Sequence, residues 1–357
     1  MRILIATDAW RPHICGVVTT LEALAATARR LGATVEFITP GEFASVPLPT
    51  YPGLRCALPR PAEIAARIRR CRPDAIHIAT EGPIGLMVRR FCLKNNVPFT
   101  TSFTTRFPEY AASRFPFPVG WGYAALRRFH AAAAATMVST ASLARELRSR
   151  GFDRIRIWSR GVDTDLFRPE RAIDLDLPRP IFVSVGRIAP EKNLDAFLSL
   201  QLPGSKVVIG GGPQEQVLRR RFPEVKFLGS MGGAQVAAHV AAADVFVFPS
   251  RTDTFGIVQL EALACGVPVA AFPVTGPADV IGTSPVGVLD EDLRRACLGA
   301  LRLSREACRA HALKFSWQAS AEQFLANAAR IVHEPIPYPA PLPATGLASA
   351  NSAAGAP

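Results

Sequence analysis

The sequence lacks the features of a membrane-spanning, secreted or disulfide-linked protein. No apolar run reaches 18 residues, so no membrane-spanning helix is predicted. The stretch from Met1 to Asp8 reads as a buried strand, and it shows no basic region, apolar stretch and cleavage site in that order. The seven cysteines form no Cys-x-x-Cys pair, which argues against a zinc site or a disulfide framework. We therefore expect a cytoplasmic protein.

Two other motifs are absent in the form that their chemistry requires. Gly210-Gly211-Gly212 follows an inner strand and lacks the later glycine of a dinucleotide fingerprint, which leaves a nicotinamide-dependent dehydrogenase as a weaker alternative. Asp163-Thr164-Asp165 and Asp174-Leu175-Asp176 match a metal-binding Asp-x-Asp by letters only, and they fall in a linker. We predict no metal ion and no other cofactor.

The order of apolar segments indicates an α/β protein of two domains. A chain of 357 residues is long enough for two cores, and short apolar strands alternate with helical stretches as in parallel sheets. The first series of strands is predicted over 2–8, 34–40, 74–80, 98–103, 136–140 and 153–158. The second is predicted over 180–186, 205–211, 225–229, 244–249 and 268–273. We predict doubly wound domains over 1–170 and 178–315, then a helix over 316–333 and a disordered Pro/Ala-rich tail over 334–357.

Positive charge is concentrated in the first domain. The net charge is +12, of which residues 1–170 carry +11. This asymmetry favours an anionic partner, either lipid head groups or nucleic acid, over a merely solvated basic surface. Arginines beside exposed aromatic residues favour a membrane surface over nucleic acid, and they lie in Arg67–Arg72, Arg89-Arg90, Arg127-Arg128 and 107–121. We expect peripheral attachment to the inner face of the cytoplasmic membrane.

A pair of cations follows the first strand of the second domain. The strand ends at Gly186, and Arg187 and Lys192 stand five residues apart on the loop that leads into a helix. Strand ends of open α/β sheets face the ligand crevice. Two cations there suit a diphosphate whose charge grows as its bond to a sugar breaks.

A second loop of the same domain combines carboxylates with a helix N-terminus. A strand ends at Pro249 and a helix is predicted to start near Gly256, so the amides of Phe255, Gly256 and Ile257 are available for phosphate or sugar oxygens. Asp253 precedes this helix and Glu261 lies two turns into it. Carboxylates that accept from vicinal hydroxyls are suited to holding a ribose or a hexose, although helix capping and a satisfied buried acid are the plain alternatives.

Taken together, these motifs resemble the family-4 retaining glycosyltransferases of the GT-B fold. The similarity runs through Asp8–Pro12, Gly16–Val18, Thr101–Tyr110, Arg160–Asp163, the two loops above, Gly210–Pro213 and Phe227–Gly229. The resemblance implies two Rossmann-like domains facing a cleft, with the helix at 316–333 completing the first domain. The stretch Thr104–Tyr110 is also similar to that of bacterial lipid glycosyltransferases and mannosyltransferases.

The resemblance also implies a role for each site residue. Arg187 and Lys192 would bind the donor diphosphate, and Asp253 would contact the donor sugar. Glu261 would hold the ribose. Gly16 would let a loop approach the phosphates, and the backbone of Gly229, Ser230 and Met231 would border the base.

The sequence departs from the family pattern at three positions. Asp253 replaces the usual glutamate and Cys15 replaces an asparagine. Thr104 stands where many relatives carry a histidine on the acceptor side of the donor sugar, and His13 is one candidate to substitute for it. The missing histidine concerns one catalytic contact on the acceptor side and not the donor site.

The prediction is therefore a retaining, metal-independent hexosyltransferase that takes sugar from a nucleotide diphosphate. A membrane lipid such as diacylglycerol is the favoured acceptor. A soluble or polysaccharide acceptor is the alternative within the same class. A catalytically silent nucleotide-sugar or membrane-binding module is the alternative from another class.

Overall fold

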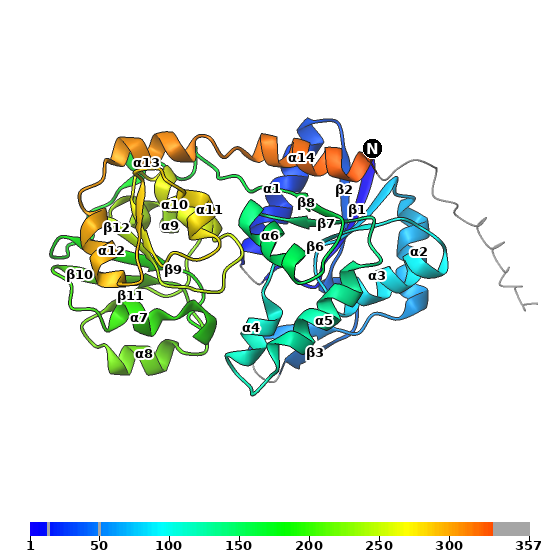
Figure 1. Ribbon diagram of the computed structural model, residues 1–357, viewed down its shortest axis with the longest axis horizontal. Helices are drawn as coiled ribbons and strands as arrows, with labels where there is room; N and C mark the ends of the chain where they lie inside the picture. The colour runs from blue at the N-terminus through cyan, green and yellow to red at the C-terminus, as the bar shows by residue number, and fades with distance from the viewer. Residues whose placement is uncertain (13–14, 49–50, 331–357) are drawn as a thin grey trace, which may run out of the picture.

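The computed structural model describes residues 1–12, 15–48 and 51–330 and contains two parallel six-stranded sheets (Figure 1). The two sheets belong to domains that lie side by side, each covered by its own helices. His13 and the predicted tail at 334–357 lie outside the described residues.

The first sheet has the strand order β2-β1-β5-β6-β7-β8. Its strands are β1 (Arg2–Ala6), β2 (Thr34–Ile38), β5 (Ala75–Ile78), β6 (Thr100–Ser102), β7 (Ala135–Val138) and β8 (Ile155–Ile157). The helices of this domain are α1 (Gly16–Arg30), α2 (Pro61–Cys71), α3 (Pro83–Lys94), α4 (Phe107–Ala112), α5 (Val119–His130) and α6 (Ala141–Ser149). A hairpin of β3 (Ser45–Leu48) and β4 (Tyr51–Ala57) lies apart from this sheet.

The second sheet has the order β11-β10-β9-β12-β13-β14. Its strands are β9 (Ile181–Val185), β10 (Ser205–Ile209), β11 (Lys226–Phe227), β12 (Val245–Phe248), β13 (Val269–Ala271) and β14 (Gly287–Leu289). The helices are α7 (Leu194–Leu198), α8 (Glu215–Arg221), α9 (Gly233–Ala241), α10 (Ile257–Ala264), α11 (Pro277–Ile281), α12 (Leu293–Ala300) and α13 (Arg305–Ala312).

Continuous apolar strands explain why both sheets are covered on two faces. Every residue of β5, β7 and β12 is buried, as expected for inner strands of a parallel sheet with helices on each side. In the second domain, Val183, Phe246 and Leu260 belong to the core on one face, and Phe182, Val245 and Phe197 belong to the core on the other.

In each sheet, the direction in which successive strands are added reverses once. In the first sheet this switch lies between β1 and β5, and in the second it lies between β9 and β12. Loops that leave neighbouring strands in opposite directions open a crevice at the carboxyl edge of such a sheet. The crevice of the second sheet is therefore formed by the loops after Val185 and after Phe248.

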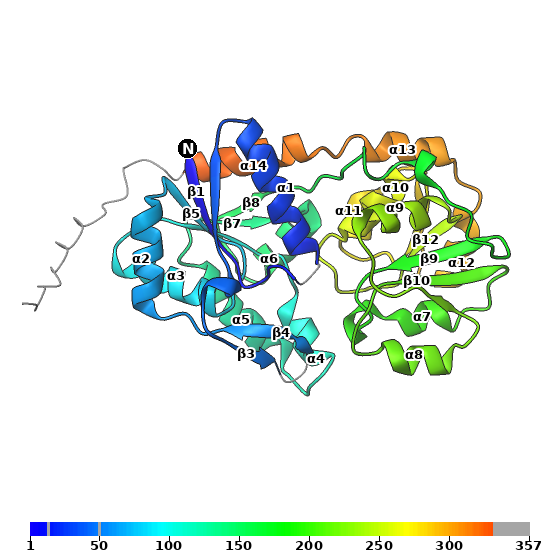
Figure 2. The same cartoon turned by 180° about the vertical axis from the view of Figure 1, so that it is seen from behind.

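The last described helix, α14 (Trp317–Ala329), returns from the second domain to the first (Figures 1 and 2). Ala321, Phe324 and Ala328 enter a core that includes Leu21 and Leu24 of α1. The indole of Trp158 donates to the hydroxyl of Ser320 at 3.1 Å. Chain on both sides of the second domain thus contributes to the first domain's core.

The predicted strand series agree with the observed strands, apart from shorter ends, but they omit three elements. The sequence patterns did not indicate the β3–β4 hairpin or the edge strand β14. β14 is only three residues long and none of them is fully buried, so it shows little apolar contrast. The hairpin contains Pro47 and Pro52, and proline lowers the apparent strand propensity of a segment.

Candidate active site

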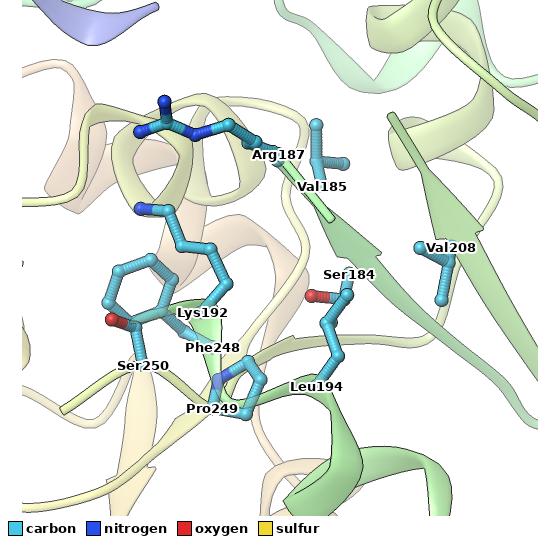
Figure 3. A pocket seen from close by; sticks show the side chains of 10 residues that line it. Ser184, Val185, Arg187, Lys192, Leu194, Val208, Phe248, Pro249 and Ser250 are labelled. Carbon is cyan, nitrogen blue, oxygen red and sulfur yellow. The ribbon is translucent and has the colours of Figure 1, made fainter. Parts of the chain in front are cut away.

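The loop after β9 carries both predicted phosphate-binding cations. It runs through Gly186 and Arg187 into a short turn, Pro190–Lys192, and Asn193 ends the turn in the left-handed conformation. The side chain of Asn193 donates to the carbonyl of Pro249 at 3.1 Å and so ties this loop to the end of β12. Figure 3 shows Arg187 and Lys192 extending to the same side of the pocket at the switch point.

The structure brings two of the predicted site residues into direct contact. The ammonium of Lys192 donates to both oxygens of Asp253, at 2.6 and 2.8 Å. Lys192 comes from the loop after β9, and Asp253 comes from the loop after β12. The contact is largely enclosed, because the side chains are only 22% and 14% exposed. A residue that is predicted to bind the phosphates and a residue that is predicted to bind the sugar are thus hydrogen-bonded to each other.

The N-terminus of α10 is built by a glycine in an unusual conformation. Gly256 caps the helix with a φ of 80°, and a β-carbon there would lie 2.7 Å from the ring of Phe248. Both the backbone and the packing therefore require glycine at this position. Gln259 donates to the carbonyl of Phe255 at 2.9 Å, which holds the preceding loop against the helix. The amides of Phe255, Gly256 and Ile257 therefore lie at or immediately before the helix N-terminus, as predicted.

Glu261 lies on α10 and retains partial exposure to solvent. Burial raises the pKa of its carboxyl to about 7, because the surrounding protein disfavours the charged form. Hydroxyl donors of a bound ribose would stabilise the carboxylate and lower this pKa again. Glu261 is therefore a group whose ionisation would be coupled to ligand binding.

Gly16 of the first domain lies beside the same helix. Among the described residues, a β-carbon at Gly16 would meet the side chain of Ile257 alone, at an ordinary distance of 3.8 Å. The described residues thus do not themselves require glycine at this position, and its predicted role beside the phosphates stays a prediction.

The predicted base-binding backbone lies beside a neighbouring glycine loop. The amide of Gly210 donates to the carbonyl of Gly229 at 2.8 Å, and a β-carbon at Gly211 would lie 2.8 Å from the hydroxyl of Ser230. Met231 packs at the edge of the second domain's core. The segment from Gly229 to Met231 is therefore held against the end of β10, one strand away from the cationic loop.

Thr254 connects the loop after β12 to the first domain. Its hydroxyl donates to the carbonyl of Thr104 at 2.8 Å, and its own carbonyl accepts from the hydroxyl of Ser139 at 3.1 Å. The hydroxyl of Thr104 is buried, and it has no hydrogen-bond partner within the part of the chain that the structure describes. The position where many relatives carry histidine therefore borders the predicted sugar-binding loop.

Two candidate functional residues, Tyr110 and Arg114, were not singled out by the sequence motifs. Tyr110 lies among the charged groups of Asp253, Arg187 and Glu191, and burial, reinforced by Asp253, raises the pKa of its phenol well above the usual value. Tyr110 was inside the stretch that carries the family resemblance, but no pattern distinguished it from its neighbours. Only the approach of the two domains places it at the site.

Several polar residues of the resembling stretches have structural roles. The carboxylate of Asp8 accepts from Thr80 and from the amide of Ile84, both at 2.8 Å, and so fixes the start of α3. Asp163 accepts from the amides of Asp165 and Leu166 and thus forms a turn. Within the described part of the chain, no three His, Cys, Asp or Glu side chains are grouped as metal ligands.

Solved structures that resemble this chain include glycosyltransferases of the GT-B fold. Sucrose-phosphate synthase from Thermosynechococcus elongatus superimposes with a TM-score of 0.75 at 18% identity, covering 92% of this chain and 98% of that one. The HepE protein of Anabaena, in complex with UDP-glucose, has a TM-score of 0.67 at 17% identity and covers 92% and 100%. At these identities the comparison establishes the fold, which the two facing parallel-sheet domains already indicate.

The sequence relatives identify the family. Residues 14–166 match the model of Glycosyltransferase Family 4, and residues 179–302 match that of Glycosyl transferases group 1. A GDP-mannose-dependent alpha-mannosyltransferase of Mycolicibacterium smegmatis is 30% identical over 81% of this chain and 84% of its own length. A sulfoquinovosyl transferase of Arabidopsis thaliana is 31% identical over 66% of this chain, but the match spans only 50% of that relative. The chain belongs to glycosyltransferase family 4, and it is a glycosyltransferase that uses a nucleotide sugar.

Proposed function

We propose that the protein transfers a hexose from a nucleotide diphosphate sugar to an acceptor with retention of the anomeric configuration and without a metal ion. The observation that carries this proposal is the contact between Lys192 and Asp253 beside Arg187 at the switch point of the second sheet. One cation of the loop after β9 contacts a carboxylate of the loop after β12, and a second cation of the first loop lines the same pocket, an arrangement suited to binding a diphosphate and a sugar hydroxyl side by side.

Each residue has one part in the reaction. Arg187, Lys192 and the amides at Phe255–Ile257 stabilise the diphosphate as its bond to the anomeric carbon breaks. The acceptor oxygen bonds to that carbon from the same face, and its proton passes to the departing phosphate oxygen. Asp253 orients the sugar through its hydroxyls, and Glu261 holds the ribose. The lack of a metal requirement follows from these donors, which neutralise the phosphate charge themselves.

A membrane lipid is the acceptor class that the first domain favours. Its side chains Phe107, Phe115, Phe117 and Trp121, here called the aromatic patch, are 37–75% exposed on and between α4 and α5. Arg127 and Arg128 are exposed on the same helix, α5. Within the described residues no helix is long and apolar enough to cross a membrane. Reversible attachment through aromatic side chains and arginines is therefore the mode that we propose.

The structure modifies the expected membrane surface at Arg67. This side chain is only 16% exposed and pairs with Glu36 and Glu42, so it is engaged within the protein. Arg69, Arg70 and Arg72 are exposed, but α2 lies on the side of the first domain away from the second domain (Figure 1). The aromatic patch lies on the side nearer to it. We therefore place the membrane-facing surface at α4 and α5.

A small polar acceptor is the second candidate. A D-inositol 3-phosphate glycosyltransferase of Mycolicibacterium paratuberculosis is 35% identical over 51% of this chain, and the name of that relative specifies a soluble phosphorylated acceptor. The match covers 48% of that relative, so it bears on the second candidate only in part.

A donor screen followed by an acceptor screen tests the proposal. Thermal unfolding with GDP-mannose, UDP-glucose, UDP-galactose and ADP-glucose should show stabilisation by one of them, because a ligand that binds only the folded state raises its melting temperature. Transfer from that donor is then measured on diacylglycerol-containing vesicles and on inositol phosphate. Donor binding without hydrolysis or transfer to any acceptor would favour a catalytically silent module.

A further inference from the structure

An arginine of the first domain reaches the phosphate-binding loop of the second. Arg114 follows α4, and its guanidinium donates to Oε2 of Glu191 at 2.6 Å. Glu191 belongs to the turn between Arg187 and Lys192, and its side chain is 1% exposed. A buried carboxylate between the two predicted phosphate ligands therefore has a partner from the opposite domain.

The two arginines that face Glu191 hold it unequally. Arg187 forms an ion pair with Oε1, at 3.3 Å from its terminal nitrogen, and among the described residues that oxygen accepts no hydrogen bond. Arg114 makes a short, charge-assisted hydrogen bond to the other oxygen. Shorter charge-assisted contacts in enclosed surroundings are the stronger ones, so Arg114 contributes more than Arg187 to compensating the charge of Glu191.

Loss of the contact between Arg114 and Glu191 would strengthen the interaction of Arg187 with Glu191. A buried carboxylate without its main partner is strongly unfavourable, and the nearest cation is drawn to it. That cation is Arg187. A hydrogen bond from Arg187 to Glu191 would compete directly with a contact from Arg187 to a donor diphosphate.

We propose that Arg114 is a positioning residue for the donor site, because by holding Glu191 it limits the competition between Glu191 and a donor diphosphate for Arg187. This inference rests on the proposed role of Arg187 as a diphosphate ligand. The contact between Arg114 and Glu191 requires that the two domains meet. It therefore couples the approach of the domains to diphosphate binding by the loop after β9, which carries Arg187 and Lys192.

A second hydrogen bond fixes the side chain of Arg114 at the end of α4. The guanidinium of Arg114 also donates to the carbonyl of Tyr110 at 2.8 Å, which ties the side chain back to this helix. Tyr110 itself lies beside Asp253, Arg187 and Glu191. One short segment of the first domain therefore brings both an anchored cation and a neutral phenol to the donor site.

A double-mutant cycle tests the coupling through Glu191. In the full-length protein, kcat and KM for the accepted donor are measured for Arg114→Ala, Glu191→Gln and the double variant, with Arg148→Ala of the exposed end of α6 as a matched control. Arg114→Ala should lower kcat/KM by about 10- to 100-fold in the wild-type background, the scale of weakening one charge-stabilising contact. With Gln at position 191 the same change should cost less than about threefold, because no carboxylate remains to capture Arg187.

Two results would overturn the proposal: wild-type kinetics for Arg114→Ala, or an equal loss in both backgrounds. Thermal unfolding of every variant separates a folding defect from a loss of function. Should the wild-type protein transfer no sugar, the proposed function fails, and calorimetry with GDP and UDP tests the inference separately. Weaker diphosphate binding in Arg114→Ala, restored by Glu191→Gln, would support it, and equal binding in all variants would contradict it.

Discussion

In the proposed mechanism, a bound donor competes with the contact between Lys192 and Asp253. The two groups compensate each other's charge in a largely enclosed position, and a diphosphate and a sugar hydroxyl would have to replace that compensation. The carboxylate and the cation are thereby held in place for a ligand that can satisfy both.

We predict that Lys192→Ala and Arg187→Ala each lower turnover by roughly 10²–10³, the scale of removing one stabiliser of charge that develops in the transition state. Both side chains are partly exposed, at 22% and 28%, so the fold should persist. Initial rates at saturating donor measure the loss. Near-wild-type turnover in either variant would remove that residue from the mechanism.

The two carboxylates should differ in which ligand they affect. Glu261→Gln should weaken binding of both the free nucleotide diphosphate and the nucleotide sugar, because Glu261 acts on the ribose. Asp253→Asn should weaken only the nucleotide sugar, because Asp253 acts on the transferred hexose. Calorimetric titration with both ligands measures this difference. Equal effects of the two variants on both ligands would show that the roles are wrongly assigned.

The raised pKa of Glu261 predicts a pH dependence of donor binding. The carboxyl titrates near pH 7 without ligand, and the ribose hydroxyls favour its charged form, so binding should weaken as pH falls through 7. One pH unit below the pKa the loss is about tenfold. Nucleotide-sugar affinity between pH 6 and 8 measures it, since the diphosphate of this ligand does not titrate in that range. In Glu261→Gln this slope should disappear, and a slope that persists would assign it to another group.

At the scale of elements, the loops after β9 and β12 were predictable and their partners in the first domain were not. Gly186, Arg187 and Lys192 stand out because a glycine and two cations follow a buried strand, a local pattern that requires no tertiary information. Arg114 follows a short helix in a stretch of ordinary composition, and only the meeting of two domains gives it a function. Periodicity likewise predicted the inner strands and missed β14, whose three residues are only partly buried.

The aromatic patch on α4 and α5 should mediate membrane attachment in two separable parts. Replacing Trp121 and Phe115 with Ser should remove the salt-resistant part. Replacing Arg127 and Arg128 with Ser should remove the salt-sensitive part, because each basic group near an anionic surface contributes about 1 kcal/mol. Sedimentation with anionic and neutral vesicles, at low and high salt, measures both.

A matched control is available on α2. Replacing Arg69, Arg70 and Arg72 with Ser removes three charges from the other side of the domain and should reduce sedimentation less than the changes on α5. Donor binding should be unchanged in all of these variants. A protein that ignores anionic vesicles even at low salt would lose the physical support for a lipid acceptor, and a soluble acceptor would become the better interpretation.

At the scale of the whole molecule, the proposed donor site draws its residues from both domains. Gly16, Thr104, Tyr110 and Arg114 come from the first domain, and α14 returns to that domain after the second sheet is complete. The division into two parallel-sheet domains was predictable from the order of apolar segments. The contacts between the domains were not, because they join residues that are far apart in the sequence and share no local pattern.

The central claim is transfer from a nucleotide sugar with retention and without metal. The most direct measurement is proton NMR of the product formed in excess EDTA from the donor that the thermal screen identifies, since the chemical shift and coupling constant of the anomeric proton report the configuration of the new glycosidic bond. We predict an α-glycoside from an α-linked donor, at a rate unaffected by EDTA. A β-glycoside, or activity that is lost in EDTA and restored by Mg²⁺ or Mn²⁺, would contradict this account.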